Sequence, residues 1–166
     1  MLEPGQSRNT AAIITSNCVC FFYIKNGGNM VEKLIKESLK AIKHKDIPVA
    51  AIIVKNGKII SKAHNGRIKN NLTINHAEIS AISKANRKLK DFRLFDCDLY
   101  VTLEPCEMCM TVIKEARIKN VYYLMPRNKD KKQFNKTNIC LINTEEDKVN
   151  KYKEMLTQFF KDNCNR

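Results

Sequence analysis

The strongest constraint on the fold is a set of three potential metal ligands that come from two separate segments. His76 stands well before Cys106 and Cys109 in the chain, so a shared metal ion requires the fold to bring the two segments together. One imidazole and two thiols leave the fourth position of a tetrahedral zinc ion open, which is typical of a catalytic rather than a structural zinc site. Glu78 adds a carboxylate beside His76 that need not bind the metal.

Both parts of this set lie where a helix is predicted to begin. Pro105 precedes Cys106, and its fixed φ suits a helix start. Cys106 and Cys109 are three residues apart, so one helical turn presents both sulfurs on the same face. The unpaired N–H groups and the positive dipole end of a helix start favour the thiolate, the form that binds zinc. A lone C-x-x-C or a lone histidine is common, but the joint pattern favours a hydrolytic zinc site.

Apolar runs and helical patterns alternate along the chain. Helices are predicted at 30–44, from His76, from Pro105, and from an N-cap at Thr144 through Phe160, and strands at 49–54, 58–63, 99–103, 120–124 and 139–142. Asn56-Gly57 predicts a two-residue hairpin turn between the first two strands, and 65–75 is predicted to be a loop. Strands that alternate with helices predict an α/β sandwich in which part of the sheet is parallel.

The charge of the chain favours a polyanionic partner. Lys and Arg number 30 against 17 Asp and Glu, a net charge of +13, and the stretch 119–136 is especially basic. Such a surface attracts phosphates, which favours nucleic acid or a phosphorylated substrate. An AT-rich genome, which enriches Lys in every protein, would be the alternative source of this charge.

The cysteine content and the hydropathy of the chain indicate in which cellular compartment the protein resides. The seven cysteines are an odd number, and Cys106 and Cys109 alone have ligand spacing, which indicates a reducing compartment with free thiols. No apolar run reaches the length that spans a bilayer, so no membrane association is expected. The expected location is the cytoplasm, or an organelle if the N-terminal segment is a targeting sequence.

One domain is expected from a length of 166 residues. Residues 30–166 are predicted to form it, because Met30 opens the first well-patterned helix. Residues 1–29 are predicted to be an extension outside the fold. Residues 10–24 faintly resemble the apolar part of a signal peptide, but the polar residues 15–17 interrupt that part.

The order His-x-Glu, then Pro-Cys-x-x-Cys, is the signature of the zinc nucleobase deaminases. Within that superfamily, which includes the cytidine and deoxycytidylate deaminases, the chain resembles the bacterial-type tRNA-specific adenosine deaminases. The similarity runs from about 47 to 119 and resumes near the end of the chain. The stretches that carry it are 48–51, 64–65, 75–79, 99–109, 116–118 and 159–161.

This resemblance implies a fold, an activity and a set of roles. The fold would be a three-layer α/β/α sandwich with a five-stranded mixed sheet, as in cytidine deaminase. The activity would be hydrolytic deamination of adenosine to inosine at the wobble position of tRNA anticodons by a zinc-activated water. The enzyme would be a homodimer in which both subunits contact the tRNA. The implied roles are zinc ligation by His76, Cys106 and Cys109, with one Zn²⁺ per subunit, proton transfer by Glu78, and substrate binding by Asn65, Ala77, Phe159, Phe160 and Lys161.

Two other functions remain open from the residues alone. The same zinc motif serves deaminases of a free base or nucleotide, such as guanine, cytosine or dCMP. A catalytically silent RNA-binding or structural zinc module is a third reading, although such a module would gain little from Glu78. The chain also departs from the family after the fourth predicted strand, where 125–134 has no glycine and the segment is shorter than the family's usual acidic, glycine-containing loop. This departure bears on substrate choice more than on the chemistry.

Overall fold

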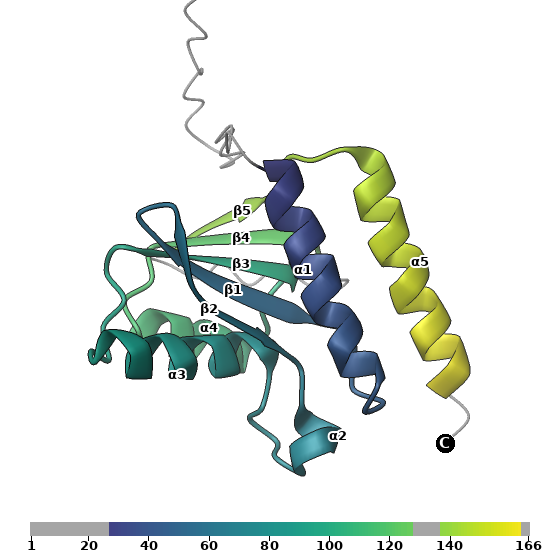
Figure 1. Cartoon of the computed structure of the whole chain (residues 1–166), viewed down its shortest axis with the longest axis horizontal. Helices are drawn as coiled ribbons and strands as arrows, with labels where there is room; N and C mark the ends of the chain where they lie inside the picture. Colours follow the sequence, from purple (N-terminus) through teal and green to yellow (C-terminus); the bar gives the residue numbers. More distant parts are fainter. Residues whose placement is uncertain (1–26, 128–136, 164–166) are drawn as a thin grey trace, which may run out of the picture.

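The computed structural model describes residues 27–127 and 137–163. At its centre lies a mixed five-stranded sheet (Figure 1). The helices are α1 (Gly27–Ile42), α2 (Arg67–Asn70), α3 (Ala77–Leu89), α4 (Glu107–Glu115) and α5 (Glu146–Asn163). The strands are β1 (Ala50–Lys55), β2 (Lys58–His64), β3 (Cys97–Leu103), β4 (Asn120–Met125) and β5 (Asn138–Leu141). Their order in the sheet is β2-β1-β3-β4-β5, with β1 antiparallel to both neighbours and β3, β4 and β5 parallel. This confirms the predicted α/β fold and its mixed sheet.

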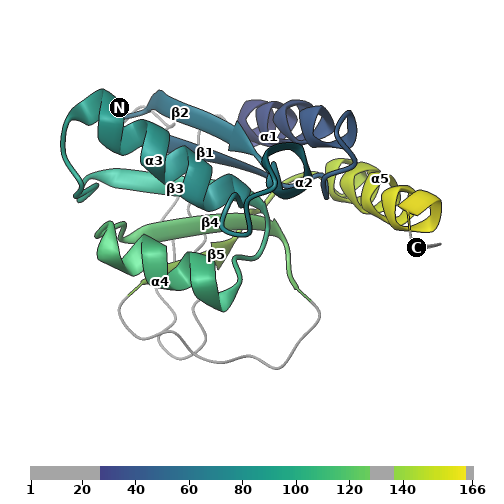
Figure 2. The same cartoon turned by 90° about the horizontal axis from the view of Figure 1, so that it is seen from below.

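Helices cover both faces of the sheet, which gives the three predicted layers (Figure 2). The period of two along a strand sends alternate side chains to opposite faces. Ala51 and Ile53 of β1 therefore pack in the core beneath α3 and α4, whereas Ala50 and Ile52 pack in the core beneath α1 and α5. Because β1 is buried on both faces, its sequence is a continuous apolar run rather than an alternating one.

The hairpin between β1 and β2 forms where the sequence predicted it. Asn56 has a φ of 50° and Gly57 a φ of 73°. Positive φ at both central residues is the requirement of a type I′ turn, the turn whose twist matches that of the flanking strands. Asn and Gly tolerate this conformation, which explains why the pair marked the turn.

The topology places two helix starts at one edge of the sheet. Helix α3 leads into β3, and β3 leads into α4, so both helices run back along the strand direction. The starts of α3 and α4 therefore lie together, beyond the carboxyl ends of the parallel strands β3 and β4. The two helices also pack against each other. This arrangement meets the constraint that His76, Cys106 and Cys109 impose.

Several predicted boundaries differ from the structure. The predicted loop 65–75 contains the one-turn helix α2. Cys106, not Pro105, is the residue directly before α4, so Pro105 lies two residues before the first residue of the helix, Glu107. Thr144 lies two residues before the start of α5 at Glu146 and is therefore not the residue that directly precedes the helix. Helix propensity alone locates the ends of helices poorly, because neighbouring tertiary contacts decide them.

The proposed limits of the domain fall mostly outside the described residues. Helix α1 begins at Gly27, three residues before the predicted start at Met30. The rest of the predicted extension, residues 1–26, and most of the altered loop after β4, residues 128–136, are not among the described residues. Within the described part of the chain, no helix has both the length and the apolar character that a bilayer crossing needs.

A buried tyrosine connects α5 to β3 and to the segment that leads into β1. The hydroxyl of Tyr152, which is fully buried, donates to the carbonyl oxygen of Pro48 at 3.1 Å and lies 3.1 Å from Thr102 Oγ1. Thr102 Oγ1 in turn accepts a hydrogen bond from the N–H of Ala50 at 3.1 Å. The last helix is thus connected to the segment that enters β1 and to β3.

Tyr152→Phe is expected to lower the free energy of unfolding by about 1–3 kcal/mol, because it leaves buried polar groups without their partner. Urea unfolding of both proteins measures this difference. The double variant Tyr152→Phe/Thr102→Val is expected to lose less than the sum of the single variants, since the second change removes one of those orphaned groups. A change below about 0.5 kcal/mol for Tyr152→Phe would contradict this account of the contact.

Candidate zinc site

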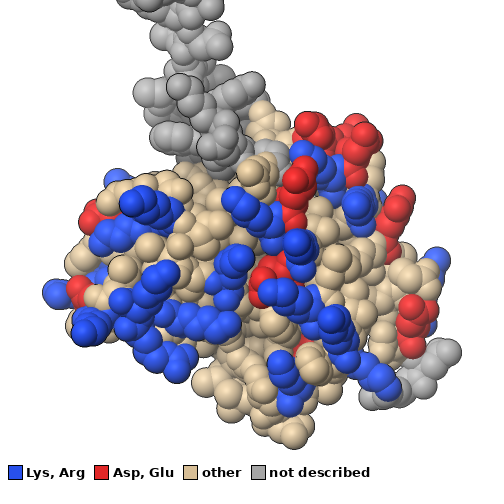
Figure 3. Space-filling view, viewed as in Figure 1, with Lys and Arg blue, Asp and Glu red and all other residues tan. Residues whose placement is uncertain are grey.

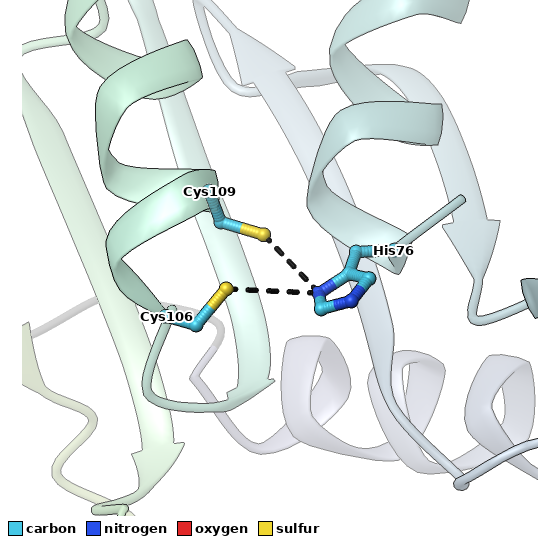
Figure 4. A group of neighbouring side chains, drawn as sticks. All are labelled: His76, Cys106 and Cys109. Atoms are coloured by element: carbon cyan, nitrogen blue, oxygen red, sulfur yellow. Dashed lines mark hydrogen bonds between the residues drawn. The ribbon is translucent and has the colours of Figure 1, made fainter. Parts of the chain in front are cut away.

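Three donor atoms converge where α3 and α4 begin. His76 Nδ1 lies 3.7 Å from Cys106 Sγ and 3.5 Å from Cys109 Sγ, and Figure 4 shows both thiols pointing from α4 toward the ring. His76 and Cys106 are the residues directly before the two helices, both in extended conformation, and Cys109 lies in the first turn of α4. The structure thus brings together the three side chains that the sequence singled out as metal ligands.

The spacing of the three atoms suits one tetrahedral zinc ion. Bonds of about 2.3 Å to sulfur and about 2.0–2.1 Å to nitrogen, at tetrahedral angles, separate nitrogen from sulfur by about 3.6 Å. Both observed nitrogen–sulfur distances are close to this value. Among the described residues, the group that could hold a metal consists of these three side chains, which is one fewer than a closed structural shell.

The two thiols influence each other's ionisation. A hydrogen bond from the Cys109 thiol to the Cys106 sulfur lowers the pKa of Cys106 to about 5 and raises the pKa of Cys109. The backbone of Cys109 and the charges of His76 and Arg127 lower the pKa of Cys106 further, against the effect of its burial. One thiolate is therefore present at neutral pH, and a zinc ion would displace the remaining proton.

Glu78 lies buried in the first turn of α3, directly beside this group. Only 3% of its surface is exposed, and burial raises the pKa of Glu78 to about 7. The negative charge of Cys106 also raises this pKa, whereas a hydrogen bond with Cys109 and the charge of Arg127 lower it. A carboxyl group with a pKa near neutrality can both accept and donate a proton under physiological conditions.

Comparison with known proteins connects this geometry to a family. The family described as the cytidine and deoxycytidylate deaminase zinc-binding region matches residues 25–125, more than half of the chain. The chain belongs to this deaminase family. The match confirms the predicted zinc cofactor, since zinc binding defines the matched region and the donor set fits it.

Individual relatives of this chain are named for one activity. A tRNA-specific adenosine deaminase of Streptococcus pyogenes serotype M18 is 43% identical over 93 residues, which cover 56% of this chain and 58% of the relative. A tRNA-specific adenosine deaminase of Aquifex aeolicus is 45% identical over 89 residues, which cover 54% of this chain and 59% of the relative. The match therefore extends over a little more than half the length of these relatives.

Solved structures with the same fold include two kinds of deaminase. A structure from a study of A-to-I editing by tRNA:A34 deaminases is 30% identical, with a TM-score of 0.64, and the alignment covers 69% of this chain and 97% of that one. A guanine deaminase of Bacillus subtilis is 26% identical, with a TM-score of 0.57, and the alignment covers 78% of this chain and 93% of that one. The predicted cytidine deaminase-like fold is thereby confirmed.

The two residues predicted to hold the substrate base, Asn65 and Ala77, lie near His76 in the sequence. Asn65 is buried, its N–H donates to the carbonyl oxygen of Val49 at 2.9 Å, and it lines a cavity of about 430 Å³. Asp46, Arg67 and other residues complete the wall of the cavity, and the three metal donors are not among those that line it. The side chain of Ala77 is fully buried in the core, so any contact with a substrate would use its backbone.

The remaining predicted substrate contacts lie in another layer of the fold. Phe159, Phe160 and Lys161 belong to the last turns of α5, which packs beside α1 on the opposite face of the sheet from α3 and α4 (Figure 1). Phe159 is buried and Phe160 is 41% exposed, with their rings edge to face at 5.7 Å. Lys161 is exposed. The structure therefore does not bring these residues to the donor set, and their role in RNA binding stays a prediction.

Sequence reasoning missed two residues that shape the site. Arg127 lies after β4, and its charge affects the pKa values of both Glu78 and Cys106. Asp46 is 1% exposed, and its carboxylate accepts hydrogen bonds from the N–H groups of Ile68 and Lys69 at 2.8 and 3.0 Å. It thereby caps α2 at the edge of the cavity. Both residues stand in short polar connections that resemble ordinary loops, and no periodic signal marks them.

Proposed function

We propose that this chain deaminates adenosine to inosine at the wobble position of tRNA anticodons. The observation that carries the proposal is the convergence of His76, Cys106 and Cys109 with the buried carboxyl of Glu78 beside them. The similarity to relatives named as tRNA-specific adenosine deaminases supports the choice of substrate. The structural similarity to a protein from a study of tRNA:A34 deaminases supports it independently.

Each residue of the site has a defined task in this reaction. His76, Cys106 and Cys109 would hold the zinc ion, which supplies an activated water for attack on C6 of the adenine. Glu78 would take one proton from that water and pass it to a ring nitrogen, and would then pass the second proton of the same water to the departing amine, so that the oxygen stays on C6 and ammonia leaves. Asn65 would hold the extruded base by hydrogen bonds. The starts of α3 and α4 direct their positive dipole ends at the site, which stabilises the thiolates.

The surface charge supports an RNA substrate over a free base. Basic side chains dominate the surface over α1, β2 and α3, whereas acidic side chains gather near the start of α5 (Figure 3). Lys84 and Lys88 of α3 extend to the edge strand β2, where they donate to the carbonyl oxygens of Lys62 and Ile60, each at 3.1 Å. A free purine gains nothing from such a surface, whereas RNA phosphates do.

Deamination of free guanine is the second candidate, because a guanine deaminase shares the fold over most of its length. Incubation of the zinc-loaded protein with an anticodon stem-loop carrying A at the wobble position, and in parallel with free guanine, cytosine and adenosine, separates the two. The proposal expects ammonia release from the stem-loop alone. Release from guanine without release from the stem-loop would favour the second candidate.

The same assay is expected to depend on salt. If phosphate contacts dominate binding, KM for the stem-loop rises roughly tenfold or more between about 50 and 200 mM salt, because counterions compete for the lysines. Steady-state kinetics at several salt concentrations measures this. A KM that does not change with salt would contradict an electrostatic contribution of the basic surface.

The assembly and location of the protein form the last part of the proposal. A homodimer in which the tRNA contacts both subunits follows from the resemblance to the bacterial-type deaminases. Analytical ultracentrifugation of the full chain, with and without the stem-loop, tests this assembly. We expect the protein to act in the cytoplasm, where it would meet a cytoplasmic tRNA substrate.

A further inference from the structure

Asn75, the residue directly before His76, uses both ends of its side-chain amide. Asn75 Nδ2 donates to the carbonyl oxygen of Gly66 at 3.0 Å, and Asn75 Oδ1 accepts a hydrogen bond from Ser80 Oγ on α3. The backbone carbonyl oxygen of Asn75 also accepts a hydrogen bond from the N–H of Gly66 at 3.1 Å. Asn75 therefore joins the segment that follows β2 to the first turns of α3.

This contact requires glycine at position 66, because a side chain there would collide with the Asn75 amide. A Cβ atom at this position would lie 2.7 Å from Asn75 Nδ2 and 3.2 Å from Asn70 Nδ2. The φ of Gly66 is −148°, which is outside the left-handed region that favours glycine. Space for the Asn75 amide, rather than backbone freedom, is what the position requires.

The two ends of this contact adjoin two residues of the site. Gly66 follows Asn65, whose N–H is fixed to the carbonyl oxygen of Val49, and Asn75 precedes His76, whose carbonyl oxygen accepts from the N–H of Ser80 at 3.0 Å. The loop between Gly66 and Asn75 is thus closed at its base. Its closure sets the separation between the segment that bears Asn65 and the helix start that bears His76.

Building on the proposed function, we infer that Asn75 is a positioning residue that holds Asn65, and with it the substrate base, in register with the metal site at His76. It acts through Gly66 and Ser80. Without its amide, the base and the attacking water lose their fixed relation, and a displacement of about 1 Å can lower a rate by about 100-fold. The effect falls on kcat rather than on KM, because RNA affinity comes mainly from phosphate contacts.

The chain contains a matched control for this contact. Asn86, at the other end of α3, donates from its Nδ2 to the carbonyl oxygen of Asp91 at 2.8 Å. Asn86→Ala removes a similar side-chain to backbone hydrogen bond from the same helix, but away from the donor set. A general loss of stability would therefore affect Asn86→Ala and Asn75→Ala alike.

The test compares Asn75→Ala with Asn86→Ala in the full chain, at a temperature where both are folded. Asn75→Ala is expected to keep stoichiometric zinc and to lose roughly 10- to 100-fold in kcat on the wobble-A stem-loop, with KM changed by less than about threefold. Asn86→Ala is expected to keep its kcat. Gly66→Ala is expected to lower kcat as well, and its combination with Asn75→Ala to lower kcat by less than the product of the two single effects.

Equal kcat values for the Asn75→Ala and Asn86→Ala variants would overturn the inference, as would loss of zinc from Asn75→Ala. Hydrogen exchange of residues 65–76 provides a readout that needs no substrate. Exchange there should be faster in Asn75→Ala than in Asn86→Ala, and equal exchange would also overturn the inference. A wild-type protein inactive on the stem-loop would instead contradict the proposed function, and exchange would still decide whether Asn75 closes the loop.

Discussion

Glu78→Gln is expected to abolish nearly all turnover while leaving zinc and fold in place. Glutamine has almost the same shape but cannot accept and return a proton, and general acid–base catalysis contributes about 10²- to 10⁴-fold to a rate. We therefore expect kcat to fall by about that factor. Zinc content should not change, because the donor set comprises His76, Cys106 and Cys109 without Glu78. Single-turnover kinetics, together with metal analysis of the same preparation, measures both quantities.

Glu107→Gln is the matched control for this prediction. Glu107 is also an acid in the first turn of a ligand-bearing helix, but it is exposed, whereas Glu78 is 3% exposed. Both changes replace a carboxyl group beside the site with an amide, but Glu107 is exposed and solvent screens its charge, so Glu107→Gln is expected to keep its activity within about threefold. Wild-type turnover in Glu78→Gln would rule out Glu78 as the proton carrier.

Cys109→Ser is expected to remove zinc and, with it, all measurable activity. The side chain of Cys109 is fully buried, 3.5 Å from His76 Nδ1, so no other ligand can easily take its place. Loss of an outer contact to a ligand already lowers metal affinity by about 10- to 100-fold, so loss of the ligand should lower it by at least about 100-fold. Metal analysis after gel filtration measures this loss directly.

Zinc should also stabilise the wild-type fold, since it would bind the folded chain and link α3 to α4. Added zinc is therefore expected to raise the Tm of the wild type and leave that of Cys109→Ser nearly unchanged. Cys97→Ala serves as the control, because Cys97 is a buried free thiol of β3 outside the donor set. Stoichiometric zinc in purified Cys109→Ser would show that the ligand assignment is wrong.

The sequence could predict those parts of the fold that depend on local patterns. Asn56-Gly57 located the hairpin because few residue pairs tolerate positive φ at both positions. The apolar run at 49–54 indicated a strand buried on both faces. The metal donors were recognisable because thiols and imidazole at helix starts have few other uses in this spacing. The hairpin and the strand are each encoded by neighbouring residues, and so is the Cys106/Cys109 pair. His76 lies 30 residues before Cys106, so the sequence joined it to the pair through the deaminase signature.

The rest depends on contacts between distant segments, which local patterns do not record. Asn75 looks like an ordinary loop residue, and its role appears only when Gly66 and Ser80 are brought to both ends of its amide. Asp46 looks like a helix stop, yet it caps α2 from 22 residues away in the sequence. Tyr152 contacts Pro48 across 104 residues, which no pattern in the last helix announces.

The most direct test of this account is to map inosine in a tRNA whose anticodon carries A at the wobble position, after treatment with the zinc-loaded wild-type protein. Sequencing is expected to find inosine at the wobble position alone, and to find none after treatment with protein from which the metal has been removed. Absence of inosine with the zinc-loaded protein, or inosine formed equally well without zinc, would contradict the proposed function.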